Sequence, residues 1–414
     1  MYKKYLNNIM LEENEQEINL IFHYDKDLPK TTPLKEEYLK NQVLVLRNIP
    51  QPVQKSPEWY TMRETMVSAS DWGTILGVNP YSNSDNVLLN KCGENTFFAN
   101  SNMDWGNKYE DVAVKIYEYR NKVQVWDFGC IRHPFISFLG ASPDGITPNG
   151  IMLEIKCPPK RKIDGNPPSY YWCQVQGQLE VAELDRCDFL ECNIKEYEHE
   201  DAYLEDNFNG NYTLNSFGNE KGLVVEFYKK KEKTFLYDYS PVCIIGDEIE
   251  NWKKSIIEKY KSNDNLLLSG FTYWYLKDVS CVPIYRNQEW FNNTAKPILT
   301  EFWNNVLKYR ELGLNILKED IQNKKFEKKR EKIEAKKSSK KVTKKISSPI
   351  SNKKIKKIKD FINLEEDKSI FTMDITYDEE DDDDDKIILS GKSFFSDESD
   401  IPIKNTQRLS LFSD

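Results

Sequence analysis

The amino-acid sequence predicts an α/β fold, in which helices cover a β-sheet. Three observations support this prediction. Residues 151–157 are almost wholly apolar apart from two charges, as in a strand that is largely buried. Residues 103–120 carry apolar side chains at three- and four-residue spacing, which is typical of an amphipathic helix. Residues 223–228 and 234–239 have strand composition and flank a charged, turn-like run.

The strand predicted over residues 151–157 carries both of its charges on one face. Side chains alternate along a strand, so Glu154 and Lys156 point the same way while their neighbours point into the core. The motif Ser142-Pro143-Asp144-Gly145 precedes this strand. If residues 147–150 turn the chain into a hairpin, Asp144 lies beside Glu154. Two carboxylates and one ammonium would then share a patch at a sheet edge.

Such a patch suits a hard metal ion. Magnesium and manganese prefer oxygen ligands, and a bound cation lowers the pKa of its water and stabilises charge on a phosphate. A lysine beside that water can orient it or shift its ionisation. The alternative is a surface hairpin whose glutamate and lysine form a solvated pair worth less than about 1 kcal/mol.

Two segments upstream contain hydroxyls and a cation. Ser56 followed by proline and glutamate predicts the start of a helix, with Arg63 reaching outward at its end. Ser68 and Ser70 precede a second short helix that Gly77 closes. Arg63 is either a plain surface cation or a phosphate ligand. The two serines are either helix caps or phosphate contacts, and a helix N-terminus permits both.

Three further polar positions lie in predicted helices or strands. Glu110 borders the apolar stripe of residues 103–120 and is either solvated or part of a site. His133 lies inside an apolar strand, which favours a structural role. Gln174 and Gln176 belong to a predicted helix, where they are either an ordinary polar face or part of the site.

Residues 56–192 resemble a known family. Six blocks occur in the order expected of the lambda-type exonuclease and YqaJ viral recombinase group of the PD-(D/E)xK nucleases. The blocks are Ser56-Pro57-Glu58-Trp59-Tyr60 with Arg63, running on through Ser68 and Ser70 to Gly77; Trp105-Gly106-Asn107 with Glu110; His133-Pro134; Leu139 to Gly145; Glu154-Ile155-Lys156-Cys157-Pro158; and Tyr170-Tyr171 with Gln174, Gln176 and Gln178. The resemblance covers about a third of the chain.

The resemblance implies a restriction-endonuclease-like core, with a mixed central sheet flanked by helices. It implies cleavage of DNA that depends on Mg²⁺, with Mn²⁺ as the alternative ion. Asp144, Glu154 and the Ile155 carbonyl are then the expected metal ligands, Glu110 supports the metal, and Lys156 positions or activates the water. An exonuclease on duplex ends is expected, in viral-type recombination, replication or genome processing.

Further roles and rival functions follow from the same resemblance. Arg63, Ser68, Ser70 and Gln174 are expected to bind DNA phosphates, and Gln176 is preferred over Gln174 at the scissile phosphate or water. The rivals are an endonuclease on the same core and an inactive DNA-binding or packaging protein. Expected partners are DNA and a single-strand annealing recombinase or another replication protein, and a homo-oligomer is compatible with the family.

Cysteine and histidine usage argues against other metal centres. The eight cysteines include no Cys-x-x-Cys pair and the chain has three histidines, so neither an iron–sulfur cluster nor zinc is expected. Scattered cysteines fit a reducing compartment. No signal peptide and no apolar run of membrane-spanning length is found. We therefore expect a soluble, intracellular protein, in host cytoplasm or nucleus if the source is a virus.

Charge divides the chain unevenly. We expect an N-terminal extension over 1–50, a nuclease core over 51–200, an aromatic-rich part packed on the core over 201–322, and a disordered tail over 323–414. Residues 323–360 carry a net charge of +13 and residues 361–414 one of −11, against −9 for the whole chain. The basic part, disordered or a frayed helical extension, is either a DNA arm or a solubilising tail.

Aromatic side chains near residues 271–291 either stack on DNA bases or belong to the core.

Overall fold

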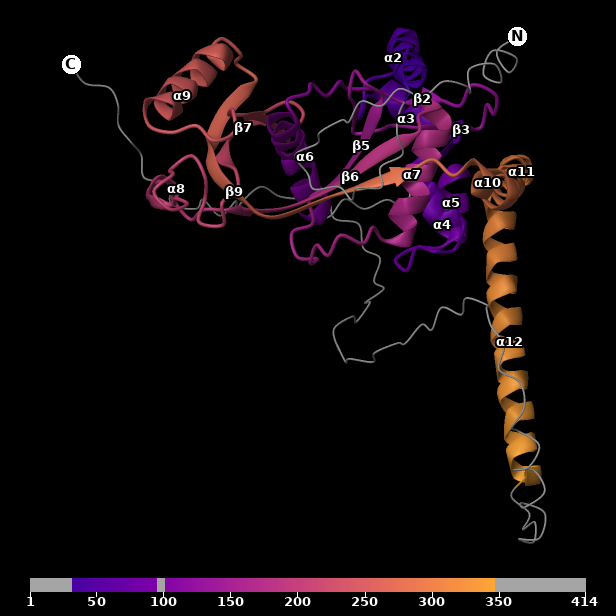
Figure 1. Ribbon diagram of the computed structural model, residues 1–414. Helices are drawn as coiled ribbons and strands as arrows, with labels where there is room; N and C mark the ends of the chain where they lie inside the picture. Colours follow the sequence, from indigo (N-terminus) through magenta and orange to yellow (C-terminus); the bar gives the residue numbers. More distant parts are fainter. Residues whose placement is uncertain (1–31, 95–100, 347–414) are drawn as a thin grey trace, which may run out of the picture. The chain divides into compact units, whose positions relative to one another are not determined.

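The computed structural model describes residues 32–94 and 101–346 (Figure 1). The possible N-terminal element at residues 15–22 and the acidic stretch 361–414 lie outside this part. The described residues divide into two units between residues 337 and 338. The first unit contains every described strand, and the last helix continues beyond residue 337.

Nine strands form two sheets within the described residues. The larger sheet has the order β4-β5-β6-β9-β7-β8 and the smaller one the order β1-β3-β2. Only β5–β6 and β1–β3 pair in parallel, so both sheets are mixed, as predicted for the central sheet. The strands are β1 Val67–Ser68, β2 Ile131–Arg132, β3 Leu139–Ala141, β4 Gly145–Ile146, β5 Ile151–Lys156, β6 Arg186–Glu196, β7 Lys221–Lys229, β8 Thr234–Tyr239 and β9 Leu266–Tyr285.

Helices occupy much of the remaining described chain. They are α2 Pro33–Asn48, α3 Pro57–Glu64, η1 Ala69–Asp71, α4 Trp72–Ile75, α5 Ser84–Lys91, α6 Ser101–Asn121, α7 Ser169–Ala182, α8 Glu200–Glu205, α9 Asp247–Tyr260, α10 Gln288–Trp290, the π-helical turn η2 Phe291–Ala295, α11 Lys296–Leu312 and α12 Leu314–Ile346. The helix predicted over residues 103–120 is α6, and the predicted hairpin over residues 223–239 is β7–β8.

The helix start predicted at Ser56 is confirmed. The Ser56 hydroxyl accepts a hydrogen bond from the Trp59 amide at 3.2 Å, and Pro57 occupies the first turn of α3. Such a cap satisfies one of the amides that a helix N-terminus leaves free. This start fixes the direction of α3 and therefore the position of Arg63 in its last turn.

Two apolar layers sandwich the central strands. On one face, Met152 of β5 and Phe189 of β6 belong to a core that includes Val175 and Leu179 of α7. On the other face, odd-numbered residues of β5, beginning at Leu153, pack with α6. Alternation along β5 thus places Glu154 and Lys156 on the α7 face. The α/β prediction, with a mixed sheet flanked by helices, is confirmed.

Close backbone contact locks α7 against α4. A Cβ on Gly73 would lie 2.7 Å from the Tyr170 Cα, and one on Gly177 would lie 2.9 Å from the Trp72 ring. Both distances are shorter than real Cβ contacts, so only glycine permits this packing. The first turn of α7 is therefore held firmly in place beside the face of β5 that carries Glu154 and Lys156.

The aromatic segment near residue 274 is part of the core. Trp274 is 1% exposed and Tyr273 is buried, so the interpretation as a core layer is confirmed for these two residues. In α12, Leu317 and Ile321 are buried, whereas every residue from Gln322 to Glu334 is exposed. The basic segment thus begins as a continuous helix that leaves the core, in agreement with the helical alternative. Among the described helices, none combines the length and apolarity needed to cross a bilayer.

Candidate active site

The predicted hairpin places Asp144 beside β5. Strands β4 and β5 pair in antiparallel register, with Gly145 opposite Leu153. Gly150 turns the chain with φ of +83°, which favours glycine. The Asp144 Oδ2 atom accepts a hydrogen bond from the Ile155 amide at 2.6 Å. Asp144 is therefore anchored to the strand that carries Glu154 and Lys156.

Glu154 is the most enclosed member of the site, with no exposed surface. Its Oε1 atom accepts from the Gln174 side-chain amide at 2.6 Å and from the Lys156 ammonium. Its Oε2 atom accepts from the Gln178 side-chain amide at 2.6 Å. A buried carboxylate is costly unless it is bonded in this way. The two glutamines of α7 therefore fix the position of Glu154.

Lys156 lies between carboxylates and an aromatic ring. Its ammonium contacts Glu154 and lies 4.8 Å from the centre of the Tyr171 ring. Burial opposes the charge on Lys156, but Glu154 and Asp144 outweigh burial and raise its pKa. In the metal-free protein the lysine is therefore a fixed positive charge that can donate to an oxygen.

Three carboxylates of the site influence one another. Burial, followed by the charges of Glu154 and Glu110, raises the pKa of Asp144 well above that of an ordinary aspartate. Burial also raises the pKa of Glu110, and the charges of Lys55 and Lys156 oppose that rise. The three acids are thus close enough to repel each other, and the nearby lysines offset this repulsion only in part. Added positive charge would stabilise the group.

The oxygen atoms present are suited in kind to a hard divalent cation. The N–H and C=O of one strand residue point to the same edge, so the Ile155 carbonyl faces the edge where its amide meets Asp144. Within the described ranges, no three His, Cys, Asp or Glu side chains are grouped as metal ligands. Mg²⁺ is often held by only one or two carboxylates and keeps several waters. Asp144, Glu154 and this carbonyl match that mode.

Gln176 does not join the other predicted site residues. Its side-chain amide donates to the Tyr285 carbonyl at 2.8 Å, and its oxygen accepts from the Asn287 amide at 2.7 Å. Residues four apart share a helix face, whereas residues two apart do not. Gln178, and not Gln176, therefore accompanies Gln174 at Glu154. Our preference for Gln176 disagrees with this geometry, and the spacing of Gln174 and Gln178 was the signal that pointed to the correct pair.

Alanine at these two buried glutamines should give opposite results. Gln176→Ala leaves a carbonyl and an amide unpaired, so we expect a loss of about 1–3 kcal/mol in the free energy of unfolding. The folded variant should keep the catalytic rate. Gln178→Ala should lower that rate about 10- to 100-fold because Glu154 loses one of its supports. Urea unfolding and single-turnover DNA hydrolysis on both variants measure the difference, and equal rate losses would contradict this assignment.

Three of the four predicted phosphate ligands come together, whereas the fourth, Gln174, donates to Glu154 instead. The Arg63 guanidinium donates to the Ser68 hydroxyl at 2.6 Å and to the Ser70 hydroxyl at 3.1 Å, and it lies 4.4 Å from the centre of the Trp59 ring. No carboxylate lies within ion-pair distance of Arg63 in the described chain. Its charge is thus available to an anion.

One contact links this arginine to the carboxylate site. The Trp59 indole donates to the Ser142 hydroxyl at 2.9 Å, and Ser142 is two residues before Asp144. The Gln54 side chain donates to the Pro143 carbonyl at 3.0 Å. Helix α3, which carries Arg63, is therefore fastened directly to the turn that carries Asp144.

Two charged neighbours of the site were not foreseen. Lys55 has a left-handed φ of +66° and lies close enough to lower the pKa of Glu110. Glu191 on β6 stands opposite Lys156 in the parallel register, is fully buried and pairs with Arg161. Neither belongs to a sequence motif that we used. Their positions depend on a backbone conformation and a strand register that motif spacing does not reveal.

His133 has a structural role, as predicted. Its Nδ1 atom accepts hydrogen bonds from the amides of Phe135 and Ile136, at 3.0 and 3.2 Å, and closes the turn after β2. Its other ring nitrogen lies 3.7 Å from Glu180. The residue thus supports a loop, and its recorded carboxylate neighbour is Glu180, not Glu110, Asp144 or Glu154.

Two viral proteins are similar to this chain in sequence. The uncharacterized protein R354 of Acanthamoeba polyphaga mimivirus is 34% identical over 329 residues, which cover 71% of this chain and 60% of that protein. A protein of African swine fever virus (strain Badajoz 1971 Vero-adapted) is 28% identical over 165 residues, which cover 32% of this chain and 47% of that protein. The chain therefore spans between about half and three fifths of these relatives.

Two solved structures show weak overall similarity. The alkaline exonuclease LHK-Exo of Laribacter hongkongensis aligns with a TM-score of 0.36 and 17% identity, over 65% of this chain and 99% of that one. A phage-related exonuclease from Haemophilus somnus 129PT aligns with a TM-score of 0.32 and 13% identity, over 61% and 96%.

A family model also matches the part of the chain that contains the site. The match is to the YqaJ-like viral recombinase domain and covers residues 58–185. This range includes Arg63, the two serines that it contacts, the three clustered carboxylates, Lys156 and the two glutamines that hold Glu154. All residues of the site therefore lie in the part of the chain that is similar to the YqaJ-like viral recombinase domain.

Proposed function

We propose that this protein is a Mg²⁺-dependent deoxyribonuclease, acting chiefly as an exonuclease on the ends of duplex DNA. The observation that carries this proposal is the grouping of Asp144, Glu154 and Lys156 on one hairpin, fastened through Trp59 to the helix that bears Arg63. Hard oxygen ligands, a fixed ammonium and a guanidinium with no carboxylate partner among the described residues are the parts needed to bind and hydrolyse a phosphodiester.

Each residue has a distinct task in the proposed reaction. Gln174 and Gln178 hold Glu154 in place, and the Ile155 amide holds Asp144. Lys156 donates to the attacking water or to the phosphate oxygens. Glu110 adds negative charge that favours a nearby cation. A bound Mg²⁺ would be held by Asp144, Glu154 and the Ile155 carbonyl, where it would acidify water and stabilise the charge that develops on phosphorus.

The mode of cleavage can be tested with DNA topology. Linear duplex and covalently closed circles of equal length would be incubated with the protein in Mg²⁺ or in EDTA. We expect progressive loss of nucleotides from the linear DNA only, and only with Mg²⁺. Nicking or linearisation of the circles would contradict the exonuclease and indicate an endonuclease on the same core.

Removing the guanidinium should reduce recognition of a terminal phosphate. Hydrogen bonds to charged groups contribute about 1.5–3 kcal/mol. Arg63→Ala should therefore lower kcat/KM on 5′-phosphorylated ends roughly tenfold to a hundredfold and leave 5′-hydroxyl ends almost unchanged. Arg47 is a matched control because it also lies over an indole, 4.1 Å from the centre of the Trp126 ring. Equal losses of kcat/KM for both kinds of end would show that Arg63 does not recognise the terminal phosphate.

The lysine-rich part of α12 is proposed to bind the DNA backbone. Lys325, Lys328 and Lys329 are exposed and follow Ile321, the last buried residue of α12 among those whose side chains the structure describes. Each phosphate contact contributes roughly 0.9 to the slope of log K against log salt. Changing these three lysines to glutamine should weaken DNA binding and reduce that slope by roughly 1–3.

The β7–β8 turn offers a control of equal charge. Lys230, Lys231 and Lys233 are exposed there, and changing them to glutamine should leave the slope unchanged. The measurement is a binding titration at several salt concentrations. An unchanged slope in the α12 variant, or the same reduction in both variants, would show that α12 is not a DNA arm.

The biological setting is proposed from the family. The matched domain is described as that of a viral recombinase, and the two similar proteins come from large DNA viruses. Work in recombination, replication or genome processing follows as the proposed role. A single-strand annealing recombinase is the kind of partner that would use the strand left by an exonuclease.

A further inference from the structure

A chain of three tyrosines connects the protein surface to Lys156. Tyr81 is 81% exposed and its ring contacts Tyr170 edge-on, with centroids 6.0 Å apart. The Tyr170 and Tyr171 rings are 4.3 Å apart, and the Tyr171 ring centre is 4.8 Å from the Lys156 ammonium. We call Tyr81, Tyr170 and Tyr171 the tyrosine ladder.

The outer tyrosine is exposed but its backbone is well ordered by hydrogen bonds. The Tyr81 amide donates to the Asn79 side chain at 3.0 Å, and that side chain donates to Thr74 at 2.8 Å. The Asn79 amide donates to the Gly73 carbonyl at 3.1 Å. An aromatic side chain on so exposed a segment does not serve the core. Its fixed backbone reduces the entropy lost when a flat ligand stacks on it.

The middle and inner tyrosines are held by α7. Gly73 lets α4 approach the Tyr170 backbone closely, as described above. Tyr171 also contacts Phe189 of β6, with centroids 5.8 Å apart. The ladder is thus built on the same helix whose Gln174 and Gln178 support Glu154. Any shift of α7 would move the ladder and the carboxylate together.

We propose that the tyrosine ladder stacks the bases of an unpaired DNA strand next to the proposed site of hydrolysis. Every base has a flat face, so exposed aromatic rings bind single strands with little dependence on sequence. A base-paired strand cannot offer these faces, because they are stacked within the duplex. This inference rests on the proposed nuclease function and adds the side chains that would hold the unpaired bases of the strand.

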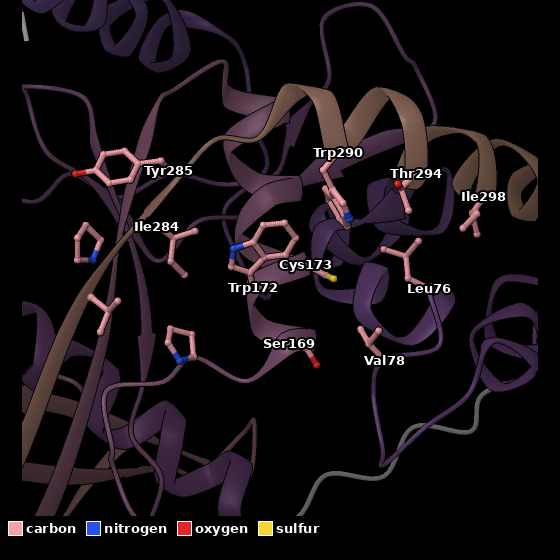
Figure 2. Close-up of a pocket in the computed structure, with 13 residues that line it drawn as sticks. Leu76, Val78, Ser169, Trp172, Cys173, Ile284, Tyr285, Trp290, Thr294 and Ile298 are labelled. Atoms are coloured by element: carbon pink, nitrogen blue, oxygen red, sulfur yellow. The ribbon is translucent and has the colours of Figure 1, made fainter. Parts of the chain in front are cut away.

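A neighbouring cavity has a different character. Its volume is about 610 Å³, and Leu76, Val78, Trp172 and Trp290 are among its lining residues (Figure 2). No charged side chain lines it, so it offers no positive charge to a phosphate. The ladder, in contrast, ends at an ammonium. A base could bind in this cavity instead of on the ladder, and the experiment must distinguish these two positions.

The test measures binding without hydrolysis. The probe is a 5′-phosphorylated duplex with three unpaired 5′ nucleotides, one of them 2-aminopurine, and the buffer contains EDTA. When the full-length protein binds this probe, stacking of 2-aminopurine on tyrosine should quench the fluorescence of the 2-aminopurine. Tyr81→Leu should weaken binding at least about fivefold and reduce the quenching, since one stacked base contributes about 1–3 kcal/mol. Tyr81→Phe should behave as the wild type.

Two control variants and one control DNA complete the test. Phe135 is 80% exposed and lies outside the ladder, so Phe135→Leu should have no effect. Trp290→Leu alters the cavity and should also have no effect. A relaxed, covalently closed circular duplex, which has no unpaired nucleotides, should bind wild type and Tyr81→Leu equally.

Three results would overturn the ladder. They are unchanged affinity in Tyr81→Leu, an equal loss in Phe135→Leu, and a loss confined to Trp290→Leu, which would place the base in the cavity. Hydrolysis is read separately by adding Mg²⁺. If the protein cleaves DNA but Tyr81→Leu binds it as tightly as the wild type, the ladder alone is rejected. If Tyr81→Leu weakens binding but the wild type does not cleave DNA, the nuclease function alone is rejected.

Discussion

Asp144→Asn is expected to abolish hydrolysis and, at the same time, to stabilise the metal-free protein. Loss of one anionic ligand removes several kcal/mol of stabilisation from the charged transition state. This corresponds to a rate reduction of roughly 10³-fold. The asparagine oxygen can still accept the hydrogen bond that the Ile155 amide makes with Asp144. The variant should therefore fold with the same hairpin.

The gain in stability follows from the pKa of Asp144. Burial and the neighbouring carboxylates raise this pKa in the folded protein. The folded state therefore holds the proton to higher pH than the unfolded chain does. Linkage then requires the free energy of unfolding to fall as the pH rises above the ordinary value of 3.8. A neutral asparagine removes this fall, so its melting temperature in EDTA at pH 8 should exceed that of the wild type.

Thermal unfolding in EDTA from pH 5 to 8 measures this effect. Asp164→Asn is the control, because Asp164 is exposed and caps a local turn through the Asn166 amide at 2.9 Å. That variant should match the wild type in both rate and stability. Loss of activity accompanied by lower stability in Asp144→Asn would show that Asp144 mainly supports the fold.

Lys156→Ala should have the second large effect. A positioned proton donor or acceptor contributes about 10²- to 10⁴-fold to a rate, and we expect a loss of hydrolysis within that range. DNA binding should change far less, because Lys156 is a single cation near a cluster of acids. Single-turnover rates and binding affinities measured on the same variant separate these two quantities.

Removal of Lys156 also removes the positive charge that offsets the buried negative charge of Glu154. Gln174 and Gln178 still donate to Glu154, so the fold should persist with a lower melting temperature. Lys160 is exposed in the loop that follows β5, and Lys160→Ala should retain the wild-type rate. A wild-type rate of hydrolysis in Lys156→Ala would show that Lys156 takes no part in the proposed reaction.

Local patterns predicted the elements around Asp144 well. The apolar run at residues 151–157 and the turn residues before it specify a hairpin whose register is nearly forced by alternation. The hairpin, α6 and the capped start of α3 all occur where the sequence places them. These features depend on neighbours within a few residues, which a sequence displays directly.

Features that depend on tertiary contacts were harder to predict from the sequence. Which glutamine of α7 meets Glu154 depends on the rotation of the helix against β5, and the structure places Gln178 there and Gln176 against the end of β9. Glu191 lies opposite Lys156 because of the parallel register of β5 and β6. The tyrosine ladder joins residues 81 and 170 through the close packing of α4 on α7. None of these relations is encoded in local spacing.

The central claim is that Asp144 belongs to a metal-dependent hydrolytic site, and one measurement tests it most directly. Linear duplex DNA phosphorylated on one 5′ end would be mixed with excess wild type or Asp144→Asn, in Mg²⁺ or in EDTA, and the released nucleotides counted over time. We predict release from the phosphorylated end by the wild type with Mg²⁺ only, and none by Asp144→Asn. Stable DNA binding by the wild type without release, across a range of Mg²⁺ and Mn²⁺ concentrations, would contradict the account and indicate a DNA-binding protein.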